Sequence, residues 1–129
     1  MSTLETTKNL TTQQVANKLV KLCRENKYEA AIHELYDDNI ISLEPEGAPN
    51  ERVAGKAAVL NKTTQWLGIV EEVHSIKISD PIVAGNYISV GMEMDITLKE
   101  VGRVPMDEIC LYQVKDGKIV YEQFFYEVS

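Results

Sequence analysis

From residue 70 to its end, the chain alternates between apolar and polar residues, the pattern of strands that bury one face. Four such segments follow one another, over residues 70–79, 86–100, 104–114 and 118–128. The last two flank "KDG", a glycine-containing turn typical of a β-hairpin. Strands in unbroken succession bury their apolar faces by pairing with one another, so this half of the chain predicts a mostly antiparallel sheet.

The N-terminal half predicts helices instead. Thr11 and Gln14 have the spacing of a capping box. Val15, Leu19 and Leu22 then recur at the i, i+4, i+7 spacing of an amphipathic helix. The expected helices cover residues 11–26, 28–39 and 56–68, with a short strand over 40–44. Helices segregated from strands indicate an α+β fold with three N-terminal helices on one face of the sheet.

Charge excludes two classes of partner. The 129 residues include 20 acidic and 13 basic side chains, a net charge of −7. Nucleic-acid phosphates and anionic membranes both need a basic face, so neither is expected as a partner. No apolar run approaches the ~18 residues of a membrane span, and no signal peptide is visible. Cys23 and Cys110 are isolated, which predicts reduced thiols in a cytoplasmic protein.

The length suits one domain with one core. Residues 1–10 are polar and lack periodicity, so we expect a flexible N-terminus there. Residues 11–129 are expected to form the single domain.

Acidic residues interrupt the last two strands. By period 2, Asp107 shares a face with Ile109 and Leu111, which predicts burial beside a core or a cavity. A buried acid is costly unless it is protonated, paired or hydrogen-bonded. Asp107 is therefore either a general acid facing a ligand or a structural acid bonded to a loop. The neighbouring Glu108 is expected on the opposite, outer face.

Three more residues are candidates for chemistry, each with a plainer alternative. Glu122 alternates with Phe124 and Tyr126 and either lines a pocket or is a solvated carboxylate at its rim. Glu44, at the end of the first strand, is either a general base or a solvated residue at a loop. His74 shares a face with two isoleucines and is either an acid–base partner of Asp107 or a core histidine.

An apolar wall is expected to complete the pocket. Its members would be aromatic residues and flexible methionines, which adapt to varied ligand shapes: Trp66, Met92, Met94, Phe124 and Tyr126. The same residues also suit an ordinary core. Two histidines among scattered acids make a poor metal site, so no metal is expected.

Two stretches carry a resemblance to a known family. Residues 35–47, "LYDDNIISLEPEG", and residues 102–126, which end in "KDGKIVYEQFFY", resemble the nuclear-transport-factor-2-like superfamily. The similarity is closest to its SnoaL-like group, which includes polyketide cyclases and is related to ketosteroid isomerase. It covers roughly residues 11–126. The resemblance implies a curved, mostly antiparallel sheet wrapped with the three helices into a cone around a long pocket.

The resemblance also implies roles for particular residues. In the isomerases a general-base Asp precedes a Pro at the end of the first strand, and Glu44 before Pro45 matches that position. A protonated Asp lies in a Pro-X-Asp stretch, which Asp107 matches in "PMD". The position of the isomerases' Tyr in the first helix falls here near Leu19 or Val20, so that donor is missing. Steroid isomerisation is therefore not expected.

The SnoaL-like resemblance implies a cofactor-independent isomerase, cyclase or hydratase acting on a small hydrophobic carbonyl compound. Two alternatives stay open: a non-catalytic binder of a small apolar ligand, and a dimeric scaffold with a vestigial pocket. A homodimer is expected in any case, because apolar residues occupy the face assigned to the outside: Met106, Tyr112, Tyr121 and Phe125.

Overall fold

The computed structural model describes residues 9–128, in which three helices and seven strands follow one another. The elements in chain order are α2 (Thr12–Arg24), α3 (Tyr28–Leu35), β1 (Tyr36–Leu43), β2 (Arg52–Ala54), α4 (Lys56–Ile69), β3 (Val70–Ile78), β4 (Ile82–Ala84), β5 (Tyr87–Leu98), β6 (Gly102–Lys115) and β7 (Lys118–Phe125). The three helices and the four long C-terminal strands confirm the predicted order. The predicted flexible segment over residues 1–10 falls largely outside the described residues.

The sequence pattern missed two short strands and misplaced two boundaries. The last strand, expected to reach residue 128, ends at Phe125. The strands β2 and β4 have three residues each, too few to show alternation. The second helix was expected to continue to residue 39, but α3 ends at Leu35 and Tyr36 already pairs with Ile119 of β7. A register shift follows between Tyr36 and Ile41, so residues 37–39, of which Asp38 and Asn39 are exposed, form an irregular start to β1.

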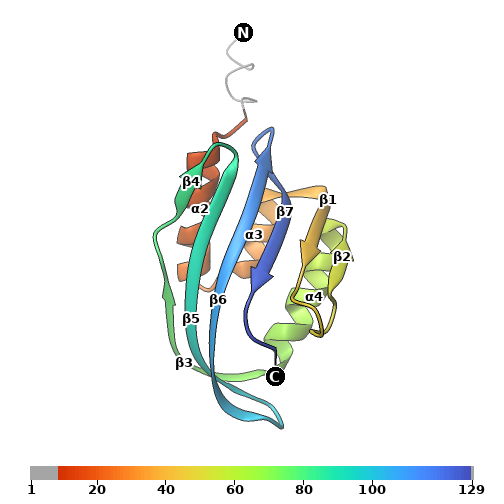
Figure 1. The fold of residues 1–129 in the computed structure, drawn as a ribbon, viewed down its shortest axis with the longest axis vertical. Helices are drawn as coiled ribbons and strands as arrows, with labels where there is room; N and C mark the ends of the chain where they lie inside the picture. The colour runs from red at the N-terminus through yellow and green to blue at the C-terminus, as the bar shows by residue number, and fades with distance from the viewer. Residues whose placement is uncertain (1–8, 129) are drawn as a thin grey trace.

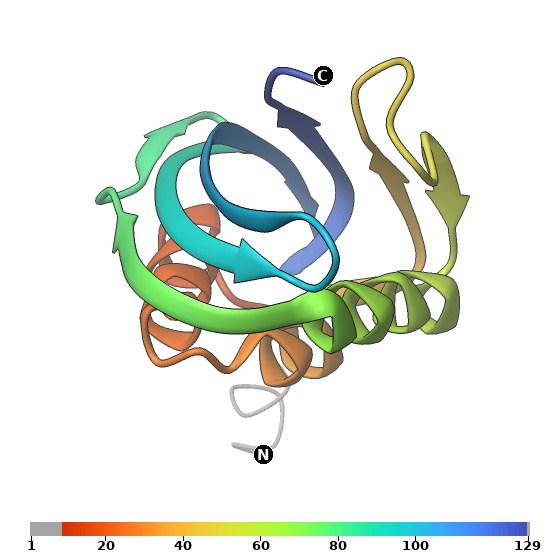
Figure 2. The ribbon, with the colours of Figure 1, turned by 90° about the horizontal axis from the view of Figure 1, so that it is seen from below.

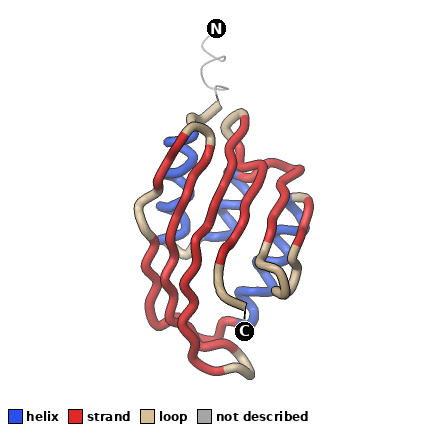
Figure 3. The backbone as a smooth tube through the Cα atoms, viewed as in Figure 1, coloured by secondary structure: helices blue, strands red, loops and turns tan. Residues whose placement is uncertain are grey.

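The strands form one strongly curved sheet in the order β2-β1-β7-β6-β5-β3, with β4 paired to β5 (Figure 1). All neighbours are antiparallel except β1 and β7, which run parallel. Seen along the strands, the sheet curls around the helices without closing into a barrel (Figure 2). Figure 3 shows the helices gathered behind one face of the sheet. The predicted α+β fold with helices on one face is confirmed.

The core lies between that face of the sheet, here called the inner face, and the helices. On α2 the predicted apolar stripe is buried, and the capping box is present, with the Thr11 hydroxyl accepting from the Gln14 amide at 3.1 Å. The inner face presents fully or nearly fully buried side chains to the helices: Ile88, Val90, Cys110, Tyr112 and Ile119. No helix among residues 9–128 has the length and apolarity needed to cross a bilayer.

The β6–β7 hairpin closes as the "KDG" pattern predicts. Asp116 and Gly117 both have positive φ, at 51° and 77°, the backbone geometry that favours glycine in tight hairpins. The turn also lies against the start of the described chain. A Cβ on Gly117 would lie 2.8 Å from the backbone nitrogen of Leu10, so only glycine fits here without movement.

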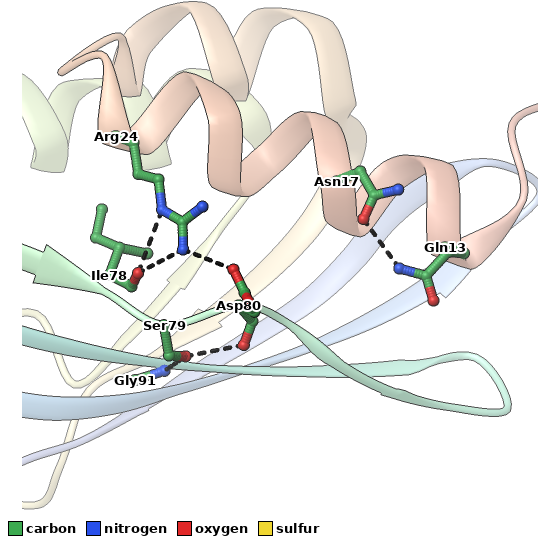
Figure 4. Close-up of polar contacts among 7 residues, drawn as sticks. All are labelled: Gln13, Asn17, Arg24, Ile78, Ser79, Asp80 and Gly91. Carbon is green, nitrogen blue, oxygen red and sulfur yellow. Dashed lines mark hydrogen bonds and ion pairs between the residues drawn. The ribbon is translucent and has the colours of Figure 1, made fainter.

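One arginine forms hydrogen bonds between α2 and the end of β3 (Figure 4). The Arg24 guanidinium donates to the carbonyl oxygen of Ile78 through Nε at 3.2 Å and through Nη2 at 2.7 Å. Nη2 also pairs with Asp80 at 2.9 Å, but the Asp80 side chain is 91% exposed. Water screens an ion pair of that kind, so the bonds to the carbonyl are expected to dominate.

We therefore predict unequal effects of breaking the two contacts. Arg24→Met keeps the aliphatic stem and should lower the free energy of unfolding by about 1–2 kcal/mol, because the Ile78 carbonyl loses its charged donor. Asp80→Ala should lower it by less than about 0.5 kcal/mol. Urea unfolding of both variants measures the difference. Equal losses would show that the ion pair, and not the carbonyl contact, holds the helix.

Candidate functional site

The structure reverses the expected sides of β6. Glu108, Cys110 and Tyr112 lie on the inner face, whereas Asp107 and Ile109 lie exposed on the outer face. The expectation that Asp107 is buried among aliphatic side chains is therefore wrong. The two-residue alternation correctly separates the residues of β6 into two faces. Each face, however, carries one acid and several apolar residues. The alternation alone could not decide which set faces the helices.

Glu122 of β7 is the acid at the centre of the inner face. Its side chain is nearly inaccessible, with the residue 2% exposed, so it is neither solvated nor at a rim. Oε1 accepts a short hydrogen bond from the Tyr36 hydroxyl, and Oε2 accepts from the Ser42 hydroxyl at 2.7 Å. Burial raises the pKa of Glu122, while the bonds from Tyr36 and Ser42 lower it in part.

A lysine extends these contacts toward the end of β1. Lys62 of α4 donates to the Ser42 hydroxyl at 2.7 Å and to Glu44 Oε2 at 2.8 Å. Tyr126, just past β7, donates to Glu44 Oε1 at 2.7 Å. The Lys62 and Glu44 side chains are each 13% exposed, so their charges are only partly screened by water. We call the connected residues the inner polar network: Tyr36, Ser42, Glu44, Lys62, Glu122 and Tyr126.

Glu108 faces this network without joining it. Its Oε1 accepts from the Cys110 thiol at 3.4 Å, a weak hydrogen bond. Burial raises the pKa of Glu108 to about 7, assisted by the negative charges of Glu44 and Glu122. The Cys110 contact and the charge of Lys62 lower it in part. A carboxyl group with a pKa of about 7 exchanges its proton near neutral pH. The sequence pattern had assigned that behaviour to Asp107.

His74 lies apart from these residues. It occupies an irregular position of β3, between the paired residues Val73 and Ser75. Its Nε2 is 2.7 Å from the Thr97 hydroxyl, and its Nδ1 is 3.3 Å from Glu72 Oε2. The structure thus brings His74 to polar partners on β3 and β5 and does not bring it to Asp107.

The residues predicted to form an apolar wall lie on several elements, and their role in lining a pocket stays a prediction. Met92 and Phe124 pack against the core from the inner face, and the ring centroid of Phe124 lies 5.3 Å from Lys62 Nζ. Met94 pairs with Met106 across β5 and β6, and both are half-buried. Trp66 is half-buried on α4. Among residues 9–128, no group of three or more metal-ligating side chains is placed to hold a metal ion.

Sequence analysis missed several residues of this site. Ser42 could have been found, because it shares a strand face with Glu44. Lys62 could also have been found, because it lies three residues after the buried Val59 and four before Trp66, on one side of α4. Tyr36 was assigned to a helix, and its bond to Glu122 spans 86 positions of sequence, which no local pattern reveals.

Two open grooves lie along strands β3, β5 and β6, with volumes of about 560 Å³ and 550 Å³. Asp107, Lys77 and Glu93 line both of them. Glu108 and Met92 border only the larger one. The grooves are therefore lined mainly by outer-face residues, and Asp107 belongs to them and not to the inner polar network.

The raised pKa of Glu108 predicts a pH dependence of stability. Its folded-state pKa of about 7 lies above the ordinary value of 4.5, so ionisation is less favourable in the folded state. The resulting loss of unfolding free energy begins as pH rises past 4.5 and is complete above about 7, on the order of 3 kcal/mol at most. Glu108→Gln should remove this part of the decline.

Urea unfolding at pH 5 and pH 8 measures the effect. Asp107→Asn is the matched control, since it neutralises the adjacent but exposed carboxylate. If the free energy of unfolding of Glu108→Gln fell between pH 5 and pH 8 as much as that of the wild type, the raised pKa of Glu108 would be contradicted.

Known proteins share both the sequence pattern and the architecture of this chain. The family model described as a SnoaL-like domain matches residues 10–126. A crystal structure from Mesorhizobium loti, provisionally named a SnoaL-like polyketide cyclase, is 33% identical, with a TM-score of 0.86 over 91% of this chain and 100% of that one. The comparison with curated proteins gave no match.

Two more distant structures share the fold. A Xanthomonas campestris protein with a cystatin-like fold is 16% identical, with a TM-score of 0.78 over 92% of each chain. A Catenulispora acidiphila protein with a ketosteroid isomerase-like fold, crystallised with trimethylamine, is also 16% identical, with a TM-score of 0.71 over 92% of this chain and 89% of that one. The family match over nearly the whole chain, together with the 33% identical structure, shows that this protein belongs to the SnoaL-like family.

Proposed function

We propose that this protein is a cofactor-independent acid–base catalyst that isomerises, cyclises or hydrates a small hydrophobic carbonyl compound. The observation that carries the proposal is Glu108, a largely buried carboxyl group whose pKa is raised to about 7. A group with such a pKa both gives and accepts protons at neutral pH, which is what general acid–base catalysis requires. The provisional cyclase name of the 33% identical Mesorhizobium loti structure supports the same class of chemistry.

The surrounding charges favour a division of roles. Glu108 in its protonated form donates to the carbonyl oxygen of the ligand and stabilises negative charge as it develops there. Glu44 is the candidate base on the carbon side. Its Oε1 accepts from the Tyr126 hydroxyl, and its Oε2 accepts from Lys62. Lys62 thereby fixes the orientation of Glu44.

A non-catalytic binding protein is the second candidate. The observation that favours it is the completeness of the inner polar network, in which Glu122, Ser42 and Glu44 each have partners from within the protein. Such saturation is typical of a structural network. Under this alternative, the charge state of Glu108 would only adjust ligand affinity.

Hydrogen exchange next to a carbonyl group separates the two candidates. We expect the wild type to accelerate deuterium incorporation at the α-carbon of small apolar ketones, such as 2-tetralone, in D₂O followed by NMR. Glu108→Gln and Glu44→Gln should each lower the rate by roughly 10²-fold or more, because each loses a proton-transfer group. Asp107→Asn should retain the wild-type rate. Binding of the ketone without exchange would support the binding protein instead.

A homodimer through the outer face of the sheet is part of the proposal, with a revised set of residues. Met106 and Tyr112 lie on the inner face and drop out, whereas Tyr121 and Phe125 stay. Ile109 and Phe125 are 49% and 47% exposed side by side on the paired strands β6 and β7. The adjoining groove holds charges of both signs, including Lys77 and Glu93. An apolar centre beside mixed charges suits self-association about a two-fold axis.

Sedimentation velocity at micromolar concentration tests the dimer. We expect the wild type to sediment as a dimer, with a buried area of at least ~1,000 Å². Phe125→Asp should give a monomer, because it places a charge at the apolar centre of the interface. Val101→Asp is the control, since Val101 is exposed at the β5–β6 turn. A monomeric wild type would rule the dimer out.

A further inference from the structure

The outer face of the sheet carries a carboxylate, an imidazole and a hydroxyl joined in series, away from the inner polar network. Glu72 and His74 belong to β3, and Thr97 belongs to β5. His74 Nε2 lies 2.7 Å from the Thr97 hydroxyl, and His74 Nδ1 lies 3.3 Å from Glu72 Oε2. The same order of groups activates hydroxyl nucleophiles on several unrelated folds. None of these three residues takes part in the proposed function.

A β-bulge brings the three side chains together. Asp95 and Ile96 are consecutive on β5, but their partners on β3 are Ser75 and Val73, so His74 is the extra residue of the bulge. A bulge of this kind re-aims a side chain and is common beside active sites. Here it directs His74 to the Thr97 hydroxyl. The His74 side chain is 20% exposed, so its ring is held by its neighbours and still reaches solvent.

The partners of His74 determine where its proton lies. A carboxylate oxygen only accepts hydrogen bonds, so Glu72 requires the proton of the neutral imidazole on Nδ1. Nε2 then has a free lone pair and accepts from the Thr97 hydroxyl. Nε2 is therefore placed to take the hydroxyl proton as Thr97 attacks an electrophile.

A cation and a groove lie next to the hydroxyl. Arg103 is the residue of β6 directly opposite Thr97, and it donates to Asp95 through Nε at 3.0 Å and through Nη2 at 2.8 Å. That pair uses two of the five N–H groups of the guanidinium, so others remain to stabilise negative charge on a reacting oxygen. The groove of about 550 Å³ starts here, because Asp95 and Arg103 line it together with Val104 and Pro105.

We propose that Thr97, His74 and Glu72 form a second catalytic site, which hydrolyses small esters through an acyl group carried on Thr97. The Thr97 oxygen attacks the ester carbonyl carbon, and its proton passes to His74 Nε2. The bond to the alcohol oxygen then breaks, and the alcohol leaves with that proton. Glu72 does not touch the substrate and acts as a positioning residue for the imidazole.

Water completes the cycle. His74 Nε2 takes a proton from a water molecule, whose oxygen attacks the acyl group on Thr97. The carboxylic acid leaves, and the proton returns to the Thr97 oxygen. The net reaction converts one ester and one water into one acid and one alcohol, so no cofactor or other reactant is needed.

The second site lies apart from the proposed dimer interface, although both belong to the outer face. Ile109, at the apolar centre of that interface, pairs with Gly91 of β5. Thr97 lies six residues farther along the same strand, which corresponds to about 20 Å. The apolar centre of a dimer therefore does not cover the Thr97 hydroxyl.

The probe for this activity is p-nitrophenyl acetate, added to the full chain at pH 8. We expect the wild type to release p-nitrophenolate, and peptide mass spectrometry after acid quenching should find an acetyl group on Thr97. Thr97→Val should lose that acetyl group and release p-nitrophenolate roughly 10²-fold more slowly. Thr97→Ser restores a nucleophile and should keep both the acetylation and the release.

Two further variants test the roles of the partners. His74→Gln removes the base and should slow release by roughly 10²-fold, as Thr97→Val does. Glu72→Gln should slow it less, by about 10-fold, because the Glu72 side chain is 66% exposed and water screens its charge.

Matched controls exclude general reactivity of the protein surface. Thr64→Val removes a threonine hydroxyl that donates to Glu29. His33→Gln removes the other of the two histidines of the chain. Both variants should acetylate and release like the wild type, and circular dichroism with thermal melting checks that every variant is folded.

Two results would overturn the proposal. One is a wild type in which acetyl groups appear only on residues other than Thr97. The other is a folded Thr97→Val that releases p-nitrophenolate as fast as the wild type. If Thr97→Val did not fold, His74→Gln would decide, since wild-type acetylation of Thr97 in that variant would show that His74 is not the base.

The acyl-transfer readout does not depend on the proposed function. Carbon-bound hydrogen exchange in ketones is measured separately, so either activity can be lost or absent without the other.

Discussion

The buried carboxyl of Glu122 is the constraint on which the inner face depends. An acid with almost no access to water must be neutral, or bonded from several sides, or both. Tyr36 and Ser42 of β1 supply those bonds, and β1 is the strand that runs parallel to β7 in an otherwise antiparallel sheet. Ser42 in turn holds Lys62, and Lys62 holds Glu44. The position of the candidate base is thereby set by a group in the core.

Most of the fold was predictable because its elements are long and periodic. The stripe of α2, the capping box at Thr11 and the strand pattern after residue 70 each point to the structure that forms. The errors lie where local pattern carries no information. The strands β2 and β4 are too short to alternate, and Tyr36 joins β1 because of its pairing with Ile119 of β7, far away in sequence.

The candidate site was less predictable, for a physical reason. Alternation on β6 separates Asp107 from Glu108 but does not say which one faces the helices, since both sets mix an acid with apolar residues. The curvature of the sheet and the pairing with neighbouring strands decide which face of β6 packs against the helices. The sequence of a single strand shows neither of them. The resemblance to the isomerases also pointed to Asp107, whereas the acid of β6 that faces the helices lies one residue later, at Glu108. A following proline marked Glu44 as a candidate and a shared strand face marked Glu122, and the functional role of both residues stays a prediction.

The two ends of the described chain differ in how close they lie to the candidate site. At one end, Leu10 lies against the β6–β7 turn at Gly117. At the other, Tyr126 holds Glu44, and Val128 lies 3.8 Å from the position that a Cβ on Gly47 would take. Purification tags and fusion partners therefore belong at the N-terminus. An extension at the C-terminus would attach close to Tyr126, whose hydroxyl group bonds to Glu44.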